Sequence, residues 1–122
     1  MSANATTNPK GQNGKKLGTV RIAPGVLATI VEATTLGVEG VIRMGDTSSS
    51  ASLSRIFSRD NNDGVKIEVK DDKVYADLYI IVDKTANLAQ VGKQVQGDVS
   101  TAIRHLVGMP VEQINVYIQN VE

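Results

Sequence analysis

The stretch from residue 65 to residue 82 constrains the fold more than any other part of the chain. Apolar residues occupy every second position on both sides of the pair Asp71-Asp72. They are Val65, Ile67 and Val69 before the pair, and Val74, Ala76, Leu78, Ile80 and Val82 after it. A period of two over this length is typical of half-buried strands, and adjacent acids between strands indicate a turn. The sequence therefore predicts an antiparallel hairpin whose apolar face must be covered by other elements.

Two segments with helical periodicity can supply that cover. Pro24 suits the first turn of a helix, and the apolar residues after it recur at spacings of three and four until Gly37, a typical C-cap. A second helix is predicted from Asn87, an N-cap with Gln90 three positions on, to Gly108. Because each helix has one apolar face, both are expected to pack on the same side of the sheet.

Three further extended segments complete the predicted order. Thr19 to Ile22 alternates as a short strand, residues 41–42 follow a turn at Glu39-Gly40, and residues 111–121 form the last strand. We expect the order strand, helix, short strand, irregular insert, hairpin, helix, strand. The fold class is then α+β, a two-layer sandwich with a mixed four-stranded sheet and two main helices packed on one face. The first and last strands are candidates for parallel neighbours through a right-handed crossover.

The length of 122 residues fits a single domain with a tail. Residues 1–18 are rich in Asn, Thr, Gly and Lys and carry no acid, so we expect a disordered basic tail ahead of one domain at 19–122. The insert from Gly45 to Gly64 is the least regular part, with a short helix predicted at 52–58. Its acidic turn at 60–64 resembles the start of a calcium loop, but no bidentate Glu follows at the twelfth position, so calcium binding is not expected.

Charge and composition argue against several classes of function. Thirteen basic residues balance thirteen acidic ones, so no overall field attracts nucleic acid or an anionic membrane. The absence of cysteine excludes disulfides, thiolate metal sites and cysteine nucleophiles. His105 is the sole histidine and lies near a predicted helix end, where a solvated imidazolium is favourable. With no phosphate-binding glycine loop and no GxSxG, we predict a non-enzyme without catalytic residues, metal or cofactor.

The sequence also sets an expectation about membranes. The N-terminus is polar, and no segment approaches about 18 consecutive apolar residues. We therefore expect a chain that is neither exported by an ordinary signal nor membrane-spanning. Any association with a membrane would come through a partner.

One set of side chains is the candidate interaction face. It lies out of phase with the predicted core: Tyr75, Asp77, Tyr79, Ile81, Asn115 and Tyr117. Aromatic residues on an open sheet face can centre a protein interface, form ordinary cross-strand pairs on a solvated face, or stack single-stranded nucleic-acid bases. The neutral net charge weakens the nucleic-acid interpretation. Asp77 and Asp83 could act as an acid–base pair, although an exposed polar face explains them equally well.

Five stretches taken together carry a family resemblance. They begin at Gly18, Gly37, Gly64, Ala76 and Val111 and read GTVRIAPGVLATI, GVEGV, GVKIEV, ADLYIIV and VEQINVYIQNV. In this order and spacing they resemble the alkaline-shock-protein family, also called the Gls general-stress family, of mainly Gram-positive bacteria. The likeness covers everything but the tail, and the part of the insert at 46–50 departs from the family pattern.

The resemblance implies a non-catalytic protein linked to cell-envelope stress. Such proteins are often abundant, self-associate, and are held near the membrane by a separate anchor protein. We therefore expect homo-oligomers in the cytoplasm, peripheral at the inner face of the cell membrane through a partner. Some relatives are tied instead to control of fatty-acid synthesis, which is one alternative; a nucleic-acid-binding module that uses the aromatic face is another. The family offers no catalytic residues to carry over.

Overall fold

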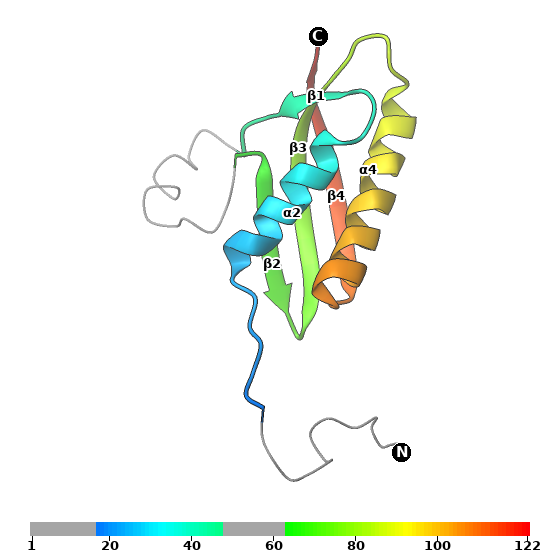
Figure 1. Ribbon diagram of the computed structural model, residues 1–122. Helices are drawn as coiled ribbons and strands as arrows, with labels where there is room; N and C mark the ends of the chain where they lie inside the picture. Colours follow the sequence, from blue (N-terminus) through cyan, green and yellow to red (C-terminus); the bar gives the residue numbers. More distant parts are fainter. Residues whose placement is uncertain (1–16, 48–62) are drawn as a thin grey trace.

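The computed structural model describes residues 17–47 and 63–122. Its elements are α2 (Pro24–Leu36), β1 (Val41–Met44), β2 (Val65–Lys70), β3 (Lys73–Val82), α4 (Leu88–Ala102), the π-helix η1 (Ile103–Val107) and β4 (Val111–Val121). Figure 1 shows α2 and α4 side by side on one face of a four-stranded sheet. The predicted α+β two-layer sandwich is confirmed.

β3 is the centre of the sheet. β4 runs parallel to it along one edge, from Val74↔Val111 to Val82↔Val121. β2 and β1 both run antiparallel to β3 and therefore share its other edge, β2 opposite residues 73–78 and β1 opposite residues 80–82. The sheet is mixed, as predicted, with two short strands lying end to end beside the central one.

The backbone of one β3 residue joins these two short strands. Gly45, directly after β1, donates its N–H to the carbonyl of Tyr79 at 2.7 Å. Tyr79 donates its own N–H to the carbonyl of Gly64, directly before β2, at 2.8 Å. Gly64 has φ of +78°, and a Cβ at this position would lie 2.8 and 2.9 Å from the carbonyl oxygens of Gly45 and Tyr79, so a side chain would not fit there. The residues between β1 and β2 thus leave and rejoin the sheet at a single point.

The predicted turn at Asp71-Asp72 is confirmed and has the expected hairpin geometry. Both residues have positive φ, 52° and 62°. Two consecutive residues in this region form a type I′ turn, whose twist matches that of the flanking strands. Aspartate tolerates the left-handed conformation better than most residues do, which explains why an Asp-Asp pair can replace the usual Asn-Gly.

The helix boundaries follow the predicted caps. The side chain of Asn87 accepts a hydrogen bond from the backbone N–H of Gln90 at 3.0 Å, as the sequence pattern predicted. Gly37 ends α2, and Gly108, with φ of +80°, ends η1. Ala23 provides no side-chain cap for α2, so that helix start depends on Pro24 and on packing.

The core lies between the helix layer and the sheet. Its fully or nearly fully buried side chains come from alternate strand positions and from one face of each helix. They include Leu27, Ala28 and Val31 of α2, Val91, Val95 and Val99 of α4, Ile103 of η1, and Val65, Val74, Leu78, Ile80 and Val82 of the sheet. The core is aliphatic throughout, as the composition indicated.

The predicted first strand is wrong. Residues 17–23 form no regular structure, and Val20 is 92% exposed. Figure 1 shows this segment leaving the start of α2 and running past the tip of the hairpin, away from the sheet. The predicted parallel pairing of the first and last strands is therefore also wrong, because β4 pairs with β3. Alternation shows that a segment suits a strand, but a strand also needs a partner edge.

Two predictions lie largely or wholly outside the described residues. The short helix at 52–58 falls between the two described ranges, as does most of the acidic turn ahead of Gly64. The tail predicted at 1–18 is described only at its last two positions.

Candidate interaction face

All six predicted interaction residues lie on the sheet face turned away from α2 and α4. We call this surface the outer face; it comprises Tyr75, Asp77, Tyr79 and Ile81 of β3 with Asn115 and Tyr117 of β4. The alternate residues of β3 are fully buried under the helices. They are Val74, Ala76, Leu78, Ile80 and Val82. The period-two pattern of the sequence therefore predicted correctly which residues of this strand point to each face.

The centre of the outer face is a stacked pair of tyrosines. Tyr79 and Tyr117 are direct partners in the parallel register, with ring centroids 4.8 Å apart and planes inclined by 17°. An offset stack of this kind contributes about 0.5–1.5 kcal/mol beyond the area it buries. Tyr117 stays 45% exposed, so the pair forms a rigid aromatic surface in contact with solvent.

Polar pairs flank this aromatic centre. The amide of Asn115 donates a hydrogen bond to the carboxylate of Asp77 at 2.9 Å, across β4 and β3. Lys66 is the antiparallel partner of Asp77 in β2. At the hairpin end, the Nζ of Lys70 lies 5.9 Å from the ring centre of Tyr75, at the limit of a cation–π contact. The face therefore has an aromatic centre with a rim of polar and charged side chains.

The second acid of the suggested acid–base pair has a different role. Asp83 lies beyond the end of β3, where its carboxylate accepts hydrogen bonds from the hydroxyl and the backbone N–H of Thr85 at 2.6 and 2.8 Å. The hydroxyl bond, followed by the N–H bond, lowers the pKa of Asp83. The carboxylate of Asp83 thus shapes the turn before α4.

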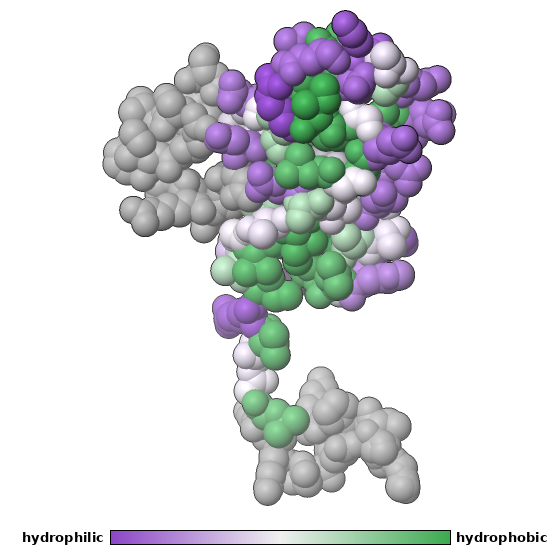
Figure 2. All heavy atoms as spheres, turned by 45° about the horizontal axis from the view of Figure 1, so that its top comes forward, coloured by the Kyte–Doolittle hydropathy of each residue, from purple (hydrophilic) through white to green (hydrophobic). Residues whose placement is uncertain are grey.

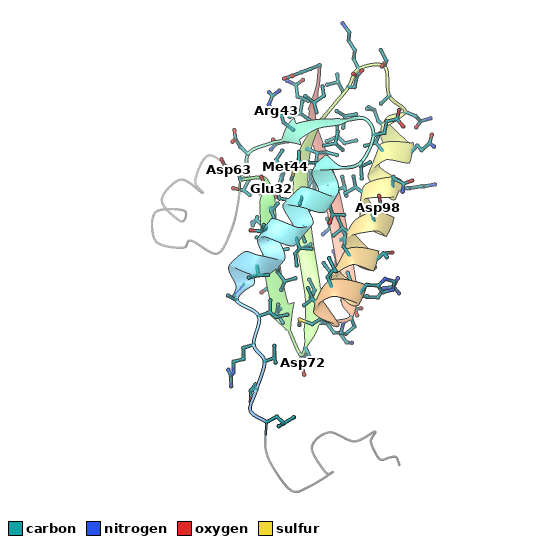
Figure 3. All side chains as sticks on the ribbon, in the orientation of Figure 1. Glu32, Arg43, Met44, Asp63, Asp72 and Asp98 are labelled. Atoms are coloured by element: carbon teal, nitrogen blue, oxygen red, sulfur yellow. The ribbon has the colours of Figure 1, made fainter. Side chains whose placement is uncertain are left out.

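An ion pair bridges the sheet at one end of the outer face. Both terminal nitrogens of Arg43 donate to the carboxylate of Glu122, at 2.6 and 2.7 Å. The hydrogen bond from Arg43 lowers the pKa of Glu122, and the same bond raises the pKa of Arg43. Arg43 is the register partner of Ile81, and Glu122 donates its N–H to the carbonyl of Val82. The pair therefore spans β3 from β1 to the end of β4; Figure 3 labels Arg43 at this end of the sheet.

The burial of Ile81 differs from the prediction that it belongs to an exposed interaction face. Ile81 has the phase of the outer face but is only 5% exposed, unlike its aromatic neighbour Tyr79. It lies at the level of the Arg43–Glu122 pair, in a region where β4 carries an extra residue. Ile81 thus supports the border of the face and does not offer apolar surface to a partner in this structure.

A second contact fixes the same border. Gln119 occupies the register shift of β4 between the partners of Ile80 and Ile81. Its side-chain amide donates to the carbonyl of Asp46 at 2.6 Å and accepts from the N–H of Asp46 at 2.9 Å. Sequence reasoning missed this contact and the ion pair, because both join residues more than seventy positions apart. The only local sign was Gly45, where a Cβ would collide with the side chain of Gln119.

Elsewhere the described residues offer little chemistry. A shallow groove of about 590 Å³ lies between the turn at residues 37–40 and the first turns of α4, with Glu39, Asp83 and Asp98 among its lining residues. Within 17–47 and 63–122 no cluster of His, Asp or Glu could hold a metal ion. His105 is exposed near the end of η1, as predicted. Among the described helices, none has the length and apolar character needed to cross a membrane.

Comparison with known proteins gives one family. The model of the alkaline shock protein 23 family, described as having a cell envelope-related function, matches residues 12–122. The Bacillus subtilis protein YqhY is 26% identical over 106 residues, which cover 87% of this chain and 78% of that protein. YloU of the same organism is 25% identical over 108 residues, covering 87% and 90%. Both relatives are therefore matched over most of their length.

Solved structures with the same architecture are more distant in sequence. MamM CTD in its copper form has a TM-score of 0.54 at 17% identity, covering 80% of this chain and 85% of that chain. A nickel form of MamM CTD gives a TM-score of 0.54, with 80% and 98% covered. At this identity the likeness concerns the α+β fold alone.

Proposed function

Because the chain belongs to the alkaline shock protein 23 family, with its cell envelope-related function, we propose that it is a non-catalytic scaffold that binds proteins, including further copies of itself. The observation that carries the proposal is the stacked, partly exposed Tyr79–Tyr117 pair at the centre of the outer face. Tyrosine is enriched at the centres of protein interfaces because a large ring buries much area at a small cost in side-chain entropy.

The surroundings of the tyrosine pair support the same role. Interfaces typically place a few rigid aromatic anchors inside a rim of polar and charged groups. Here the Asp77–Asn115 hydrogen bond lies on one side of the pair and the Arg43–Glu122 bridge on the other. Both contacts hold their side chains in fixed positions before any partner arrives, which lowers the entropy lost on binding.

The link to the cell envelope is proposed to run through a partner protein. The family description supports a role at the cell envelope, and the outer face is the surface that we propose binds the partner. In this proposal copies of the chain associate in the cytoplasm, respond to envelope stress, and are held at the inner face of the membrane by an anchor protein. Control of fatty-acid synthesis through protein binding is the runner-up and would use the same face.

Single-stranded nucleic acid is the less favoured ligand. Tyr79 and Tyr117 stack on each other, so one face of each ring is already occupied. The balanced net charge supplies no long-range attraction for phosphates. A titration with short single-stranded RNA at low salt should give no binding, and salt-dependent binding that is lost in Tyr117→Ala would favour this alternative instead.

The proposal is tested by light scattering over a concentration series. Tyr117→Ala should weaken self-association about tenfold or more if the ring is an interface anchor. The matched control is Leu106→Ala, which removes an exposed apolar side chain from η1 on the helix layer. Equal effects of the two substitutions, or a monomer at high concentration together with no protein partner recovered from native cells, would rule the proposal out.

A further inference from the structure

The segment at residues 17–22, called the arm below, is extended and exposed but carries the alternation of a strand. Val20 is 92% exposed and Ile22 is 39% exposed, and both would lie on one face of a strand. Arg21, between them, makes no ion pair within the described residues. Figure 2 shows hydrophobic residues in the arm and more at the adjoining end of the body. A strand-like segment with an apolar side exposed to water lacks a partner in the monomer.

The free edge of β2 presents backbone groups that such a segment can use. Within the described residues β2 pairs with β3 alone. Lys70 and Lys73 flank the two-residue turn and form the hydrogen-bonded pair that closes the hairpin. Because hydrogen-bonded and non-bonded pairs alternate along antiparallel strands, the N–H and C=O groups of Val65, Ile67 and Val69 point toward the free edge. Val69 is also 45% exposed through its side chain.

The opposite edge of the sheet is less suited to a new strand. On β4 the carbonyl of Ile114 already accepts a hydrogen bond from the side chain of Gln96 in α4, at 3.0 Å. The β3–β4 ladder also has register shifts between Val74 and Tyr75 and between Ile80 and Ile81. Bulges and covering side chains are common protections of edge strands. The edge of β2 is regular along its whole length.

Side-chain chemistry selects one antiparallel register. Residues directly opposite each other in a sheet point to the same face. With Val20 opposite Val69 and Ile22 opposite Ile67, the apolar side of the arm extends the helix-covered face of the sheet. Arg21 is then opposite Glu68 on the outer face, a pairing of opposite charges.

The neighbouring registers are worse. Sliding the arm by two positions places Arg21 opposite Lys66, and like charges directly opposite each other are destabilising. Sliding it by one turns Val20 and Ile22 to the polar face. In the favoured register Pro24 follows opposite Val65 and has no N–H to donate, so the ladder ends there, as it must for α2 to begin.

We propose that the arm of one copy adds as an antiparallel strand to the free edge of β2 in a second copy, with Arg21 opposite Glu68. The identity of the partner rests on the self-association proposed above, but the contact uses a different surface. In the structure the arm does not lie on its own β2, which pairs with β3 alone among the described residues. Ala23 has φ of −64° and ψ of 144°, and the proline after it restricts it to this extended region. The arm points past the hairpin tip, away from the sheet of its own chain.

Disulfide trapping between two different chains tests the contact. Residues in a hydrogen-bonded antiparallel pair have Cα atoms about 5.5 Å apart, within the range that a disulfide spans. The protein has no cysteine, so full-length Val20→Cys and a size-tagged Val69→Cys can be mixed without background from native thiols. The mixture should give a cross-linked dimer of the two chains. The matched control is Arg21→Cys with Val69→Cys, whose side chains would lie on opposite faces.

Two outcomes would overturn the proposal. One is equal cross-linking in the Val20→Cys and Arg21→Cys mixtures, which would indicate a mobile arm without a register. The other is an intrachain disulfide in a Val20→Cys, Val69→Cys double variant together with no mixed dimer, which would place the arm on its own edge. Tyr117→Ala should leave the mixed cross-link unchanged, so failure of the outer-face proposal can be told apart from failure of this one.

A charge exchange tests the register independently. Arg21→Glu should weaken self-association about 2–5-fold, the size expected for one exposed charge pair, because it faces Glu68 with a like charge. The double variant Arg21→Glu, Glu68→Arg should recover the lost affinity. Both sites are exposed, and the Glu68–Lys70 ion pair that the second change removes is a long contact of 3.8 Å between exposed side chains, so neither change threatens folding. Absence of recovery would reject the pairing of Arg21 with Glu68.

Discussion

The two faces of β3 are built from neighbouring residues but have different roles: one packs in the core, and the other carries the outer-face contacts. Leu78 and Ile80 are completely buried beneath α2 and α4, whereas Tyr79 between them lies on the outer face against Tyr117. The buried face depends on volume and close packing, and the outer face on fixed polar and aromatic contacts. A single strand thus separates the residues that stabilise the domain from those we expect to bind, and substitutions at adjacent positions can test the separation.

The largest effect is expected on the buried face. Leu78→Ala removes a side chain with no exposed surface and leaves a cavity, so it should lower the free energy of unfolding by about 2–5 kcal/mol. That is a large part of the stability of a typical small domain. Chemical denaturation of the variant and the parent protein measures the loss. A change below that of Tyr79→Ala would contradict the assignment of the two faces.

Tyr79→Ala is expected to lower the free energy of unfolding less than Leu78→Ala does, and to weaken self-association more. It removes the ring stack with Tyr117 and part of a half-buried side chain, at about 1–2 kcal/mol of unfolding free energy. The variant should remain folded by circular dichroism while self-association weakens in light scattering. Tyr79→Phe keeps the ring and serves as its control. Unchanged association in a folded Tyr79→Ala protein would remove the outer face as a binding surface.

Gly45→Ala tests the border of the outer face. A Cβ at this position would collide with the side chain of Gln119 and displace its hydrogen bonds to Asp46. Because the obstacle is the far end of a flexible side chain, we expect a loss of only about 1 kcal/mol, at the low end for overpacking. In a Gln119→Ala background the same change should cost measurably less. Equal costs in both backgrounds would show that the clash is not with Gln119.

The smallest effect concerns pH. Arg43 lowers the pKa of Glu122 below its value in the unfolded chain. The stability that this ion pair contributes is therefore present above the unfolded-state pKa and is lost as the pH falls through the lower folded-state pKa. The melting temperature of Glu122→Gln should lie below that of the parent at neutral pH, and the gap should close in acid and in high salt. If the difference in melting temperature did not depend on pH, the loss of stability would not come from the charge of Glu122.

Sequence patterns within a few residues predicted the hairpin strands, the turn and the helix cap correctly. The phase of residues 65–82, the turn at Asp71-Asp72 and the Asn87 cap were all visible, because spacing and side-chain type determine them within a few residues. The family resemblance was likewise confirmed. The arm was predicted as a strand from the same kind of pattern, and this was wrong because alternation does not identify a partner edge.

The border of the outer face could not be predicted for a different reason. Arg43 and Glu122 are 79 positions apart, and nothing in either neighbourhood selects the other. The burial of Ile81 follows from that bridge and from the register shift of β4, so it was hidden as well. The π-helical end of the second helix, Ile103–Val107, has no marker in the pattern, since its apolar residues fit α-helical spacing equally well.

The hydrogen bonds of Tyr79 to Gly45 and Gly64 have a consequence for insertions into the connection between β1 and β2. One residue of the central strand therefore anchors both ends of the connection between β1 and β2. Doubling the length of a flexible connection costs only about 0.6 kcal/mol in loop-closure entropy. We therefore expect that a tag or a small foreign domain inserted into this connection would leave the register of β1 and β2 unchanged.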